Sequence, residues 1–382
     1  MIKIYKKEDC CGCSACVHIC PKHSIAFKED CEGFLYPHVD LKTCVDCGLC
    51  EKVCPVLNQN DERLPLQTFA AKHRDDEVRM KSSSGGVFTL LAEHILDKGG
   101  VVFGAKFNEN WEVIHDYVET KEGLAPFRGS KYVQSNIGNS YKLVEEFLKI
   151  GREVMFTGTP CQIAGLKKYL RKDYKNLLTV DFVCHGVPSP MVWKKYLEEE
   201  IDRYKAILTH INFRDKSTGW KNFSVILNFA KSKSVDFEEK SLVMSTVFHE
   251  NPYMEAFMSN LCLRPSCYAC PAKSGKSGAD VTIGDFWGID TIRPDIDDDK
   301  GISLILVNNY CKLDLTGLNY NLLPYENAIE RNICIEKSVS LPVNRNYFMR
   351  QQATEGFLDS LNQCKTNKLL YRVKRLLFRL FC

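Results

Sequence analysis

After residue 66, two patterns of apolar residues follow one another along most of the chain: short continuous runs, and stretches with apolar residues at helical spacing. Short apolar runs predict strands, at residues 69–72, 101–107, 111–118, 153–156 and 177–183. Stretches with apolar residues at helical spacing predict helices between them, at residues 85–96, 140–150, 162–170 and 191–204. Further apolar runs predict strands that complete a mixed sheet, at residues 211–213, 223–229, 281–283 and 302–307. Strands alternating with helices over this length indicate an α/β core.

The first 55 residues are instead dominated by two cysteine motifs. Both read C-x2-C-x2-C-x3-C-P, from Cys10 to Pro21 and from Cys44 to Pro55. This is the spacing with which bacterial ferredoxins hold [4Fe–4S] clusters. The 34-residue offset between Cys10 and Cys44 is an internal duplication that predicts pseudo-twofold symmetry, and residues 33–39 predict a short hairpin over the clusters. We therefore expect an α+β, ferredoxin-like N-terminal module.

The spacing also predicts which cysteines share a cluster. Three thiolates on one loop hold three irons, and the fourth, followed by proline, points toward the other cluster. The predicted ligand sets are Cys10, Cys13, Cys16 and Cys54 for one cluster, and Cys44, Cys47, Cys50 and Cys20 for the other. Zinc would favour paired C-x2-C knuckles, and disulfides would need an oxidising compartment and a secretion signal. Cys11 and Cys31 fall outside the pattern and are predicted to be unligated.

Composition and charge are those of a soluble globular protein. The chain has 382 residues, of which 45% are apolar and 26% charged. A net charge of +3 gives no indication of nucleic acid as a partner. The N-terminus has no apolar signal core and no apolar run is long enough to cross a bilayer, so we expect a cytoplasmic protein. The predicted divisions are a ferredoxin module, a linker, two parts of the core and a helical tail, at residues 1–57, 58–66, 67–150, 151–325 and 326–382.

The last part of that tail, residues 365–382, is basic and has apolar residues at helical spacing. Such a stripe usually packs against the body of the protein or against a second copy in a homo-oligomer. A basic amphipathic helix can also lie on an anionic membrane surface, which would make the protein peripheral to a membrane. The sequence leaves both interpretations open.

Two turns in the predicted core have residues suited to a bound cofactor. The first contains Ser83, Ser84, Gly85 and Gly86 at a predicted helix start, where free N–H groups suit a phosphate; the alternative is a serine N-cap. The second contains Thr157, Gly158, Thr159 and Pro160, and it follows a strand, where ligands often bind. A tight turn between strand and helix would explain it equally well. Cys161, directly after this turn, is predicted to pack rather than to react.

A third cysteine group lies later in the core. Cys262, Cys267 and Cys270 supply three thiolates, and Cys184 at the end of a predicted strand is the candidate for a fourth. The two motifs upstream favour a third redox centre here. Zinc is the alternative, held by four cysteines or by three cysteines and His185. Spacing alone does not separate the two.

Several ordered motifs together resemble the family formed by the beta subunits of coenzyme F420-reducing hydrogenases and F420-linked dehydrogenases. The resemblance covers nearly the whole chain, with the ferredoxin module fused in front. The motifs lie at Ser83–Val87, Gly129–Val133, Thr157–Gln162, Cys184–Pro188 and Ala279–Gly288. The family also includes plant and bacterial reductases of chlorophyll intermediates, so analogy of fold does not name the substrate.

The resemblance implies a flavin, most commonly FAD, and a [4Fe–4S] cluster within the core. It places the flavin at the two turns, Ser83–Gly86 and Thr157–Pro160, and makes Cys184, Cys262, Cys267 and Cys270 the core ligands. It also suggests Lys131 and Arg214 as cations near an anionic flavin or substrate, whereas the sequence alone favours solvated surface charges for both.

The expected function is electron transfer from reduced ferredoxin, or another electron donor, through the clusters and FAD to a small organic acceptor. A flavin belongs at the junction because clusters carry single electrons and a hydride carries two. Two alternatives stay open: coenzyme F420 is itself the organic partner, or the chain is a non-catalytic electron-transfer subunit of a partner enzyme. The ferredoxin module fused to the chain favours an enzyme.

Overall fold

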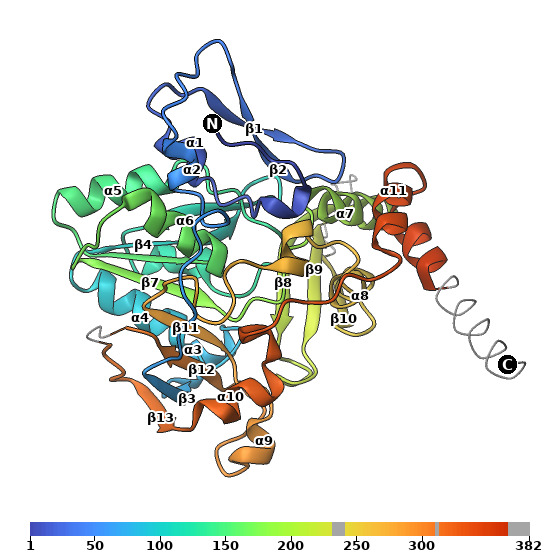
Figure 1. The fold of residues 1–382 in the computed structure, drawn as a ribbon. Coiled ribbons are helices and arrows are strands. Elements are labelled where there is room, and N and C mark those ends of the chain that lie inside the picture. The colour runs from blue at the N-terminus through green and yellow to red at the C-terminus, as the bar shows by residue number, and fades with distance from the viewer. Residues whose placement is uncertain (231–240, 310–312, 366–382) are drawn as a thin grey trace, which may run out of the picture.

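The computed structural model describes residues 1–230, 241–309 and 313–365. Its largest element is an eight-stranded sheet that runs through the body of the molecule (Figure 1). In spatial order its strands are β13 (Leu318–Leu322), β3 (Gln67–His73), β12 (Ser303–Val307), β11 (Val281–Asp285), β7 (Leu177–Phe182), β6 (Val154–Gly158), β4 (Val101–Phe107) and β5 (Val113–Val118). The strands β11, β7, β6 and β4 are parallel, and the flanking pairings are antiparallel. This mixed sheet confirms the predicted α/β core.

Helices cover both faces of this sheet because successive side chains of a strand point to opposite sides. On β6, Met155 packs on the face covered by α4 (Val87–Leu96) and η2 (Glu122–Phe127). Its neighbour Phe156 packs on the opposite face, which α5 (Ser140–Lys149) and α6 (Pro160–Leu170) cover. These three α-helices begin and end within two residues of the predicted positions.

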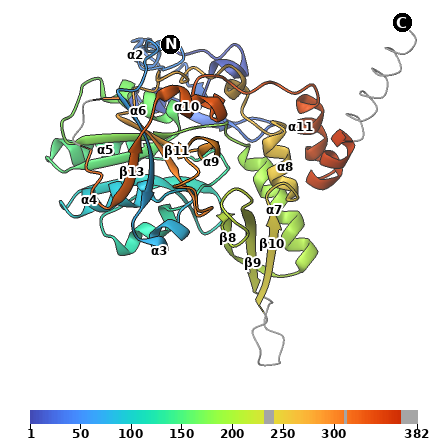
Figure 2. The same ribbon diagram turned by 90° about the horizontal axis from the view of Figure 1, so that it is seen from below.

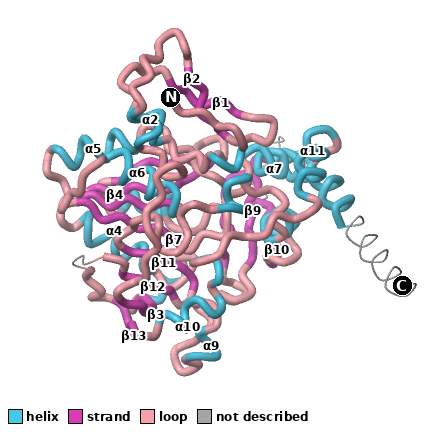
Figure 3. Tube along the Cα trace, in the orientation of Figure 1, coloured by secondary structure: helices cyan, strands magenta, loops and turns pink. Residues whose placement is uncertain are grey.

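The N-terminal module lies over the α5 and α6 side of the sheet (Figure 1) and consists mostly of loops (Figure 3). Its elements are η1 (Lys7–Asp9), α1 (Ala15–Ile19), α2 (Leu49–Lys52) and a hairpin of β1 (Ile25–Glu29) with β2 (Leu35–Val39). The two motif loops share one backbone conformation: Ser14 and Gly48, at equivalent positions, both have φ of 71°. The predicted hairpin was too short, because residues 33–39 supply only its turn and second strand.

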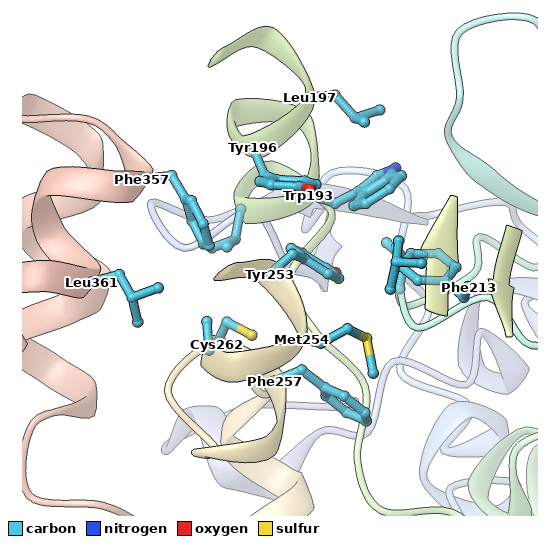
Figure 4. Close-up of a cluster of buried hydrophobic side chains, with 14 of the residues drawn as sticks. Trp193, Tyr196, Leu197, Phe213, Tyr253, Met254, Phe257, Cys262, Phe357 and Leu361 are labelled. Carbon is cyan, nitrogen blue, oxygen red and sulfur yellow. The ribbon is translucent and has the colours of Figure 1, made fainter. Parts of the chain in front are cut away.

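A second, antiparallel sheet stands beside the first (Figure 2) and is formed by β8 (Ile207–Asp215), β9 (Ser224–Ala230) and β10 (Ser241–Val247). It packs with α7 (Pro190–Tyr204) and α8 (Pro252–Met258) around aromatic residues such as Trp193, Phe213 and Tyr253 (Figure 4). The prediction that residues 211–213 and 223–229 join the mixed sheet was therefore wrong. Alternation along a strand shows that one face is buried, but it does not show which core buries it.

The described part of the chain ends in helices. α10 (Tyr325–Arg331), η4 (Ile333–Ile335) and α11 (Arg345–Thr354) precede a helical stretch over residues 357–365. The remaining short elements are α3 (Asp76–Met80), η3 (Pro265–Ala269) and α9 (Ile289–Ile292). The stripe considered for membrane contact lies outside the described residues, except for Lys365. Among the helices that are described, none is long and apolar enough to cross a bilayer.

Candidate iron–sulfur sites

The second cysteine motif folds around a small cavity at the surface of the N-terminal module. Its lining includes four cysteines, which we call the outer site: Cys20, Cys44, Cys47 and Cys50. Cys20 belongs to the first motif, so the cavity combines three cysteines of one motif with the fourth of the other. The backbone N–H groups of Ser24 and Ile2 lie 3.3 and 3.2 Å from the Sγ atoms of Cys20 and Cys50. Such donors stabilise thiolates.

The other four motif cysteines also lie close together, and we call Cys10, Cys13, Cys16 and Cys54 the inner site. Burial and then the charges of Cys10 and Cys54 raise the pKa of the Cys16 thiol. For Cys13, a hydrogen bond with Cys11 lowers the thiol pKa, but burial and the charges of Cys16 and Cys54 outweigh it. Mutual repulsion of this kind is expected where four thiolates converge without a metal between them.

A second cavity lies between the first motif loop and the mixed sheet. Four of its cysteines come from the core, and we call them the core site: Cys161, Cys184, Cys267 and Cys270. Because β6 and β7 are parallel neighbours, their carboxyl ends bring Cys161 and Cys184 to the same edge of the sheet. Cys267 lies in η3, and Cys270 follows that element directly.

Cys262 lies outside the core cavity, although the sequence and the resemblance both made it a ligand. It is fully buried in the aromatic cluster that contains Tyr253 and Phe257 (Figure 4), and burial raises the pKa of its thiol to about 12. Cys161, which the sequence predicted to pack, does pack against the cluster that contains Phe156 and Ile163, and it also lines the cavity with the other three core thiols. The signal for Cys161 was its place in the chain, directly after a turn at the carboxyl end of a strand.

The core thiols resist ionisation. Burial raises the pKa of Cys267 to about 12, and it also raises the pKa of Cys184 well above its usual value. Lys273 opposes this effect: its positive charge lowers the pKa of Cys184, and its Nζ donates to the carbonyl oxygen of Cys184 at 2.6 Å. Because cysteine binds iron as a thiolate, filling this site must release protons.

The spacing of these thiols bears on the choice between iron–sulfur and zinc. Within residues 1–230, 241–309 and 313–365, no three His, Cys, Asp or Glu side chains are arranged to hold a single metal ion. Zinc draws four sulfurs to about 2.3 Å from one point, whereas each ligand of a cubane bonds a different iron.

The inner and core sites meet along α6. Cys161 stands in the first turn of this helix, and Gly165, one turn later, faces the inner site: a Cβ on Gly165 would lie 2.7 Å from the Cβ of Cys13. Cys11 lies between the sites: it lines the core cavity, and its thiol is hydrogen-bonded with Cys13, which raises its pKa, and with Cys161, which lowers it. One helical turn is about 5.4 Å, so the two sites are direct neighbours.

The turn at Ser83–Gly86 is held by contacts within the chain. The Ser83 hydroxyl accepts from the N–H of Ser130 at 2.8 Å, and the Ser84 hydroxyl donates to the carbonyl of Ile302 at 2.9 Å. The N–H of Gly85 donates to Ser303 Oγ at 2.9 Å, and a Cβ on Gly85 would lie 2.4 Å from a β3 carbonyl oxygen. Close packing against two strands therefore explains this glycine without a ligand.

The turn at Thr157–Pro160 starts a helix. Thr159 caps α6 through a reciprocal pair of hydrogen bonds with Gln162, and Pro160 occupies the first helical position. The hydroxyl of Thr157 donates to the carbonyl of Phe103 at 2.9 Å. Pro160 also lines the core cavity, so this turn lies beside the core site.

The two candidate cations are not free surface charges. Arg214 is buried, and its guanidinium bonds Asp285 at 2.9 Å and the carbonyl of Ser83 at 3.2 Å. Lys131 is half-buried and donates to the carbonyls of Pro126 and Arg128 at 2.7 and 2.8 Å. Removal of its ammonium from water lowers the pKa of Lys131 to about 7. Both residues therefore lie near the Ser83 turn, but neither is solvated as the sequence alone suggested.

Models of known families match three segments of the chain. Residues 68–141 match the N-terminal model of the coenzyme F420 hydrogenase/dehydrogenase beta subunit, and residues 151–315 match its C-terminal model. Residues 9–58 match the 4Fe-4S dicluster domain.

The chain is also similar to individual proteins. One subunit of the F(420)H(2) dehydrogenase of Methanosarcina mazei is 25% identical over 196 residues, which are 48% of this chain and 55% of that protein. An uncharacterized ferredoxin of Methanocaldococcus jannaschii is 35% identical over 78 residues, which are 20% of this chain and 94% of that protein. A chain of the F420-reducing [NiFe] hydrogenase complex from Methanosarcina barkeri superposes with a TM-score of 0.45 and 17% identity, covering 79% of this chain and 91% of that one. The chain thus spans about half the length of the first relative.

Proposed function

Because the chain belongs to the family of coenzyme F420 hydrogenase/dehydrogenase beta subunits, we propose that it transfers electrons through three [4Fe–4S] clusters between a protein donor and an organic redox partner. The observation that carries this proposal is the gathering of cysteines into three groups of four, at the outer, inner and core sites. Four thiolates are the ligand set of one such cluster, which exchanges single electrons when bound.

The order of the sites supports a route from the surface to the core. Cys47 is exposed, so the outer site lies where a partner protein can reach it. Cys50 of the outer site is close enough to the inner site for its charge to raise the pKa of Cys16. Cys11 and α6 then join the inner site to the core site. The outer site is therefore next to the inner site, and the inner site is next to the core site.

We further propose FAD at the core end of this route, where it would couple single electrons to hydride transfer. The support is the family resemblance and the position of Pro160 at the core cavity. The hydrogen-bonding groups of Ser84 and Gly85 are already used within the chain, so they do not fit as flavin contacts in this conformation. We therefore assign no reaction step to these residues.

Anaerobic purification followed by iron, sulfide and flavin analysis tests both proposals. About twelve irons are expected for three filled sites, and one FAD in addition for the enzyme. About twelve irons without flavin would refute the FAD proposal and leave a relay. Colourless protein that lacks acid-labile sulfide would overturn the function as a whole.

A second candidate gives coenzyme F420 the role of the organic partner. It is favoured by the relative from Methanosarcina mazei, which is a subunit of an F420H2 dehydrogenase. Reduced F420 and reduced ferredoxin should be added separately to the anaerobic protein while the visible absorbance of the clusters is followed. Bleaching by reduced F420 supports this candidate, and bleaching by reduced ferredoxin alone supports a different organic partner.

A further inference from the structure

One buried arginine reaches both the inner and the core site. Arg264 is 1% exposed; its Nη2 lies 3.6 Å from Cys10 Sγ, and its Nε donates to the Cys10 carbonyl at 2.8 Å. The same side chain lines the core cavity, and the Arg264 carbonyl accepts from the N–H of Cys267 at 2.9 Å. Arg264 therefore touches a cysteine of each site.

Arg264 differs from the other buried arginines in its partners. Arg79, Arg214 and Arg345 each pair with a carboxylate, those of Asp298, Asp285 and Glu32. Arg264 pairs with no carboxylate among the residues that the structure describes. A buried charge without a counter-charge is costly. The nearest group that can carry the balancing negative charge is the thiol of Cys10, 3.6 Å from Nη2.

The remaining contacts of Arg264 fix its position but carry no charge. Its Nη1 donates to Gln134 Oε1 at 3.0 Å and its Nη2 donates to the carbonyl of Leu35 at 2.9 Å. The guanidinium carbon lies 4.4 Å from the ring centre of Tyr36. Gly12 closes over it, because a Cβ on Gly12 would lie 2.9 Å from that carbon. The cation is thus held in place between two sets of thiols.

We propose that Arg264 is a positioning residue whose charge is balanced by the clusters of the inner and core sites, and that it raises their reduction potentials above that of the outer site. This inference rests on the proposed function. Four thiolates give a bound cluster a net negative charge that grows on reduction, so a fixed cation nearby favours the reduced form. At the outer cavity the charged lining groups are Lys22, Asp46 and the N-terminal ammonium of Met1. The ammonium is already paired with Asp46 at 2.7 Å, and Lys22 and Asp46 are exposed to water, which screens them. With higher reduction potentials at the inner and core sites than at the outer site, electron transfer from the outer site inward is energetically downhill.

Redox titration of the anaerobic protein, followed by electron paramagnetic resonance, tests this proposal. In Arg264→Gln we expect two of the three cluster potentials to fall and the third, assigned to the outer site, to stay unchanged. Arg264→Lys moves the charge away from Cys10 Sγ and removes a hydrogen bond to sulfur, so a smaller fall is expected at the inner site. The proposal would be overturned by unchanged potentials in Arg264→Lys, or by an equal fall at all three sites in either variant. The measurement on Arg264→Lys decides the matter if Arg264→Gln does not load iron.

Arg345→Gln is the matched control. Arg345 is also buried and also joins the N-terminal module to the core, but it pairs with Glu32 at 2.8 Å. Its replacement should leave all three potentials unchanged. Iron and sulfide content separates the two levels of failure: wild-type protein without clusters refutes the proposed function, whereas filled sites with unshifted potentials refute only the role of Arg264.

Discussion

The outer and core sites each gather four cysteines, but they do so in opposite settings. The outer site is built within residues 20–50, in a module made mostly of loops, and Cys47 is exposed. The core site draws on residues 161–270 and lies between that module and the mixed sheet, next to the buried cations Arg264 and Lys273. The comparison shows that a short motif suffices for a site that a partner must reach. A site next to buried, fixed charges needs the topology of the whole domain.

The largest expected effect concerns which cysteines belong to the core site. Cys161→Ala should lose about four irons, one whole cluster, because a lining thiol of the core cavity is removed. Cys262→Ala should keep full iron content, since Cys262 lies in the aromatic cluster. Iron and sulfide assays on anaerobically purified protein measure the difference. Loss of iron in Cys262→Ala, with full content in Cys161→Ala, would restore the ligand set that the resemblance implied.

This contrast also shows how far the sequence predicts the sites. Cys20 could be grouped with Cys44, Cys47 and Cys50 from the sequence alone, because the spacing of a ferredoxin motif fixes its loop geometry locally. Cys161 could not be grouped with Cys184, because only the parallel pairing of β6 and β7 brings their ends together. The spacing from Cys262 to Cys267 looked equally regular, yet Cys262 points into a hydrophobic core.

The fold shows the same limit. The strands of the mixed sheet were predictable as short apolar runs because helices cover both faces of the sheet, and its helices were predictable because each has one buried face with a helical period. The assignment of β8 and β9 to a separate sheet was not, because the core that they fill includes residues far away in the chain, such as Phe34, Val113 and Phe348. Local patterns predict which elements form, and long-range packing determines which elements meet.

A second prediction compares the accessibility of the two sites. Mild oxidation with a chelator should remove the outer cluster first, because Cys47 is exposed whereas the four core cysteines are only partly exposed. Alkylation followed by mass spectrometry should then label the exposed Cys47 before the partly exposed Cys161 and Cys184. Early labelling of the core thiols would contradict the proposed order from surface to core.

A third prediction concerns acid and the boundary between module and core. Burial lowers the pKa of His18 to about 4, and its ring packs 5.2 Å from that of Tyr141 across this boundary. The unfolded chain takes up a proton near pH 6.5 and the folded one does not, so stability present above pH 6.5 is lost as the pH falls toward 4. The free energy of unfolding should fall by up to about 3 kcal/mol over this range.

Denaturant midpoints measured anaerobically between pH 7 and pH 4.5 check this expectation. His18→Gln removes one titrating group and should reduce the pH dependence without abolishing it, because burial also lowers the pKa of His115 to about 4. The exposed His38→Gln should leave the pH dependence as it is in the wild type. An unchanged pH dependence in His18→Gln would show that acid acts elsewhere than at this boundary.

The smallest expected effect tests how closely the inner site is packed compared with the outer one. Gly165→Ala would bring a Cβ to 2.9 Å from Cys13 Sγ, and overpacking of this kind costs about 1–3 kcal/mol. Alanine in a helix interior is otherwise favoured over glycine by about 1 kcal/mol, so a net loss of stability would report the contact itself. At the outer site, a Cβ on Gly48 would have no atom within 4 Å, and the equivalent position of the first motif holds Ser14 with the same φ of 71°. We therefore expect a smaller loss of stability in Gly48→Ser. Thermal unfolding of the two variants compares the sites directly, and a stabilised Gly165→Ala would mean that the module does not rest on α6.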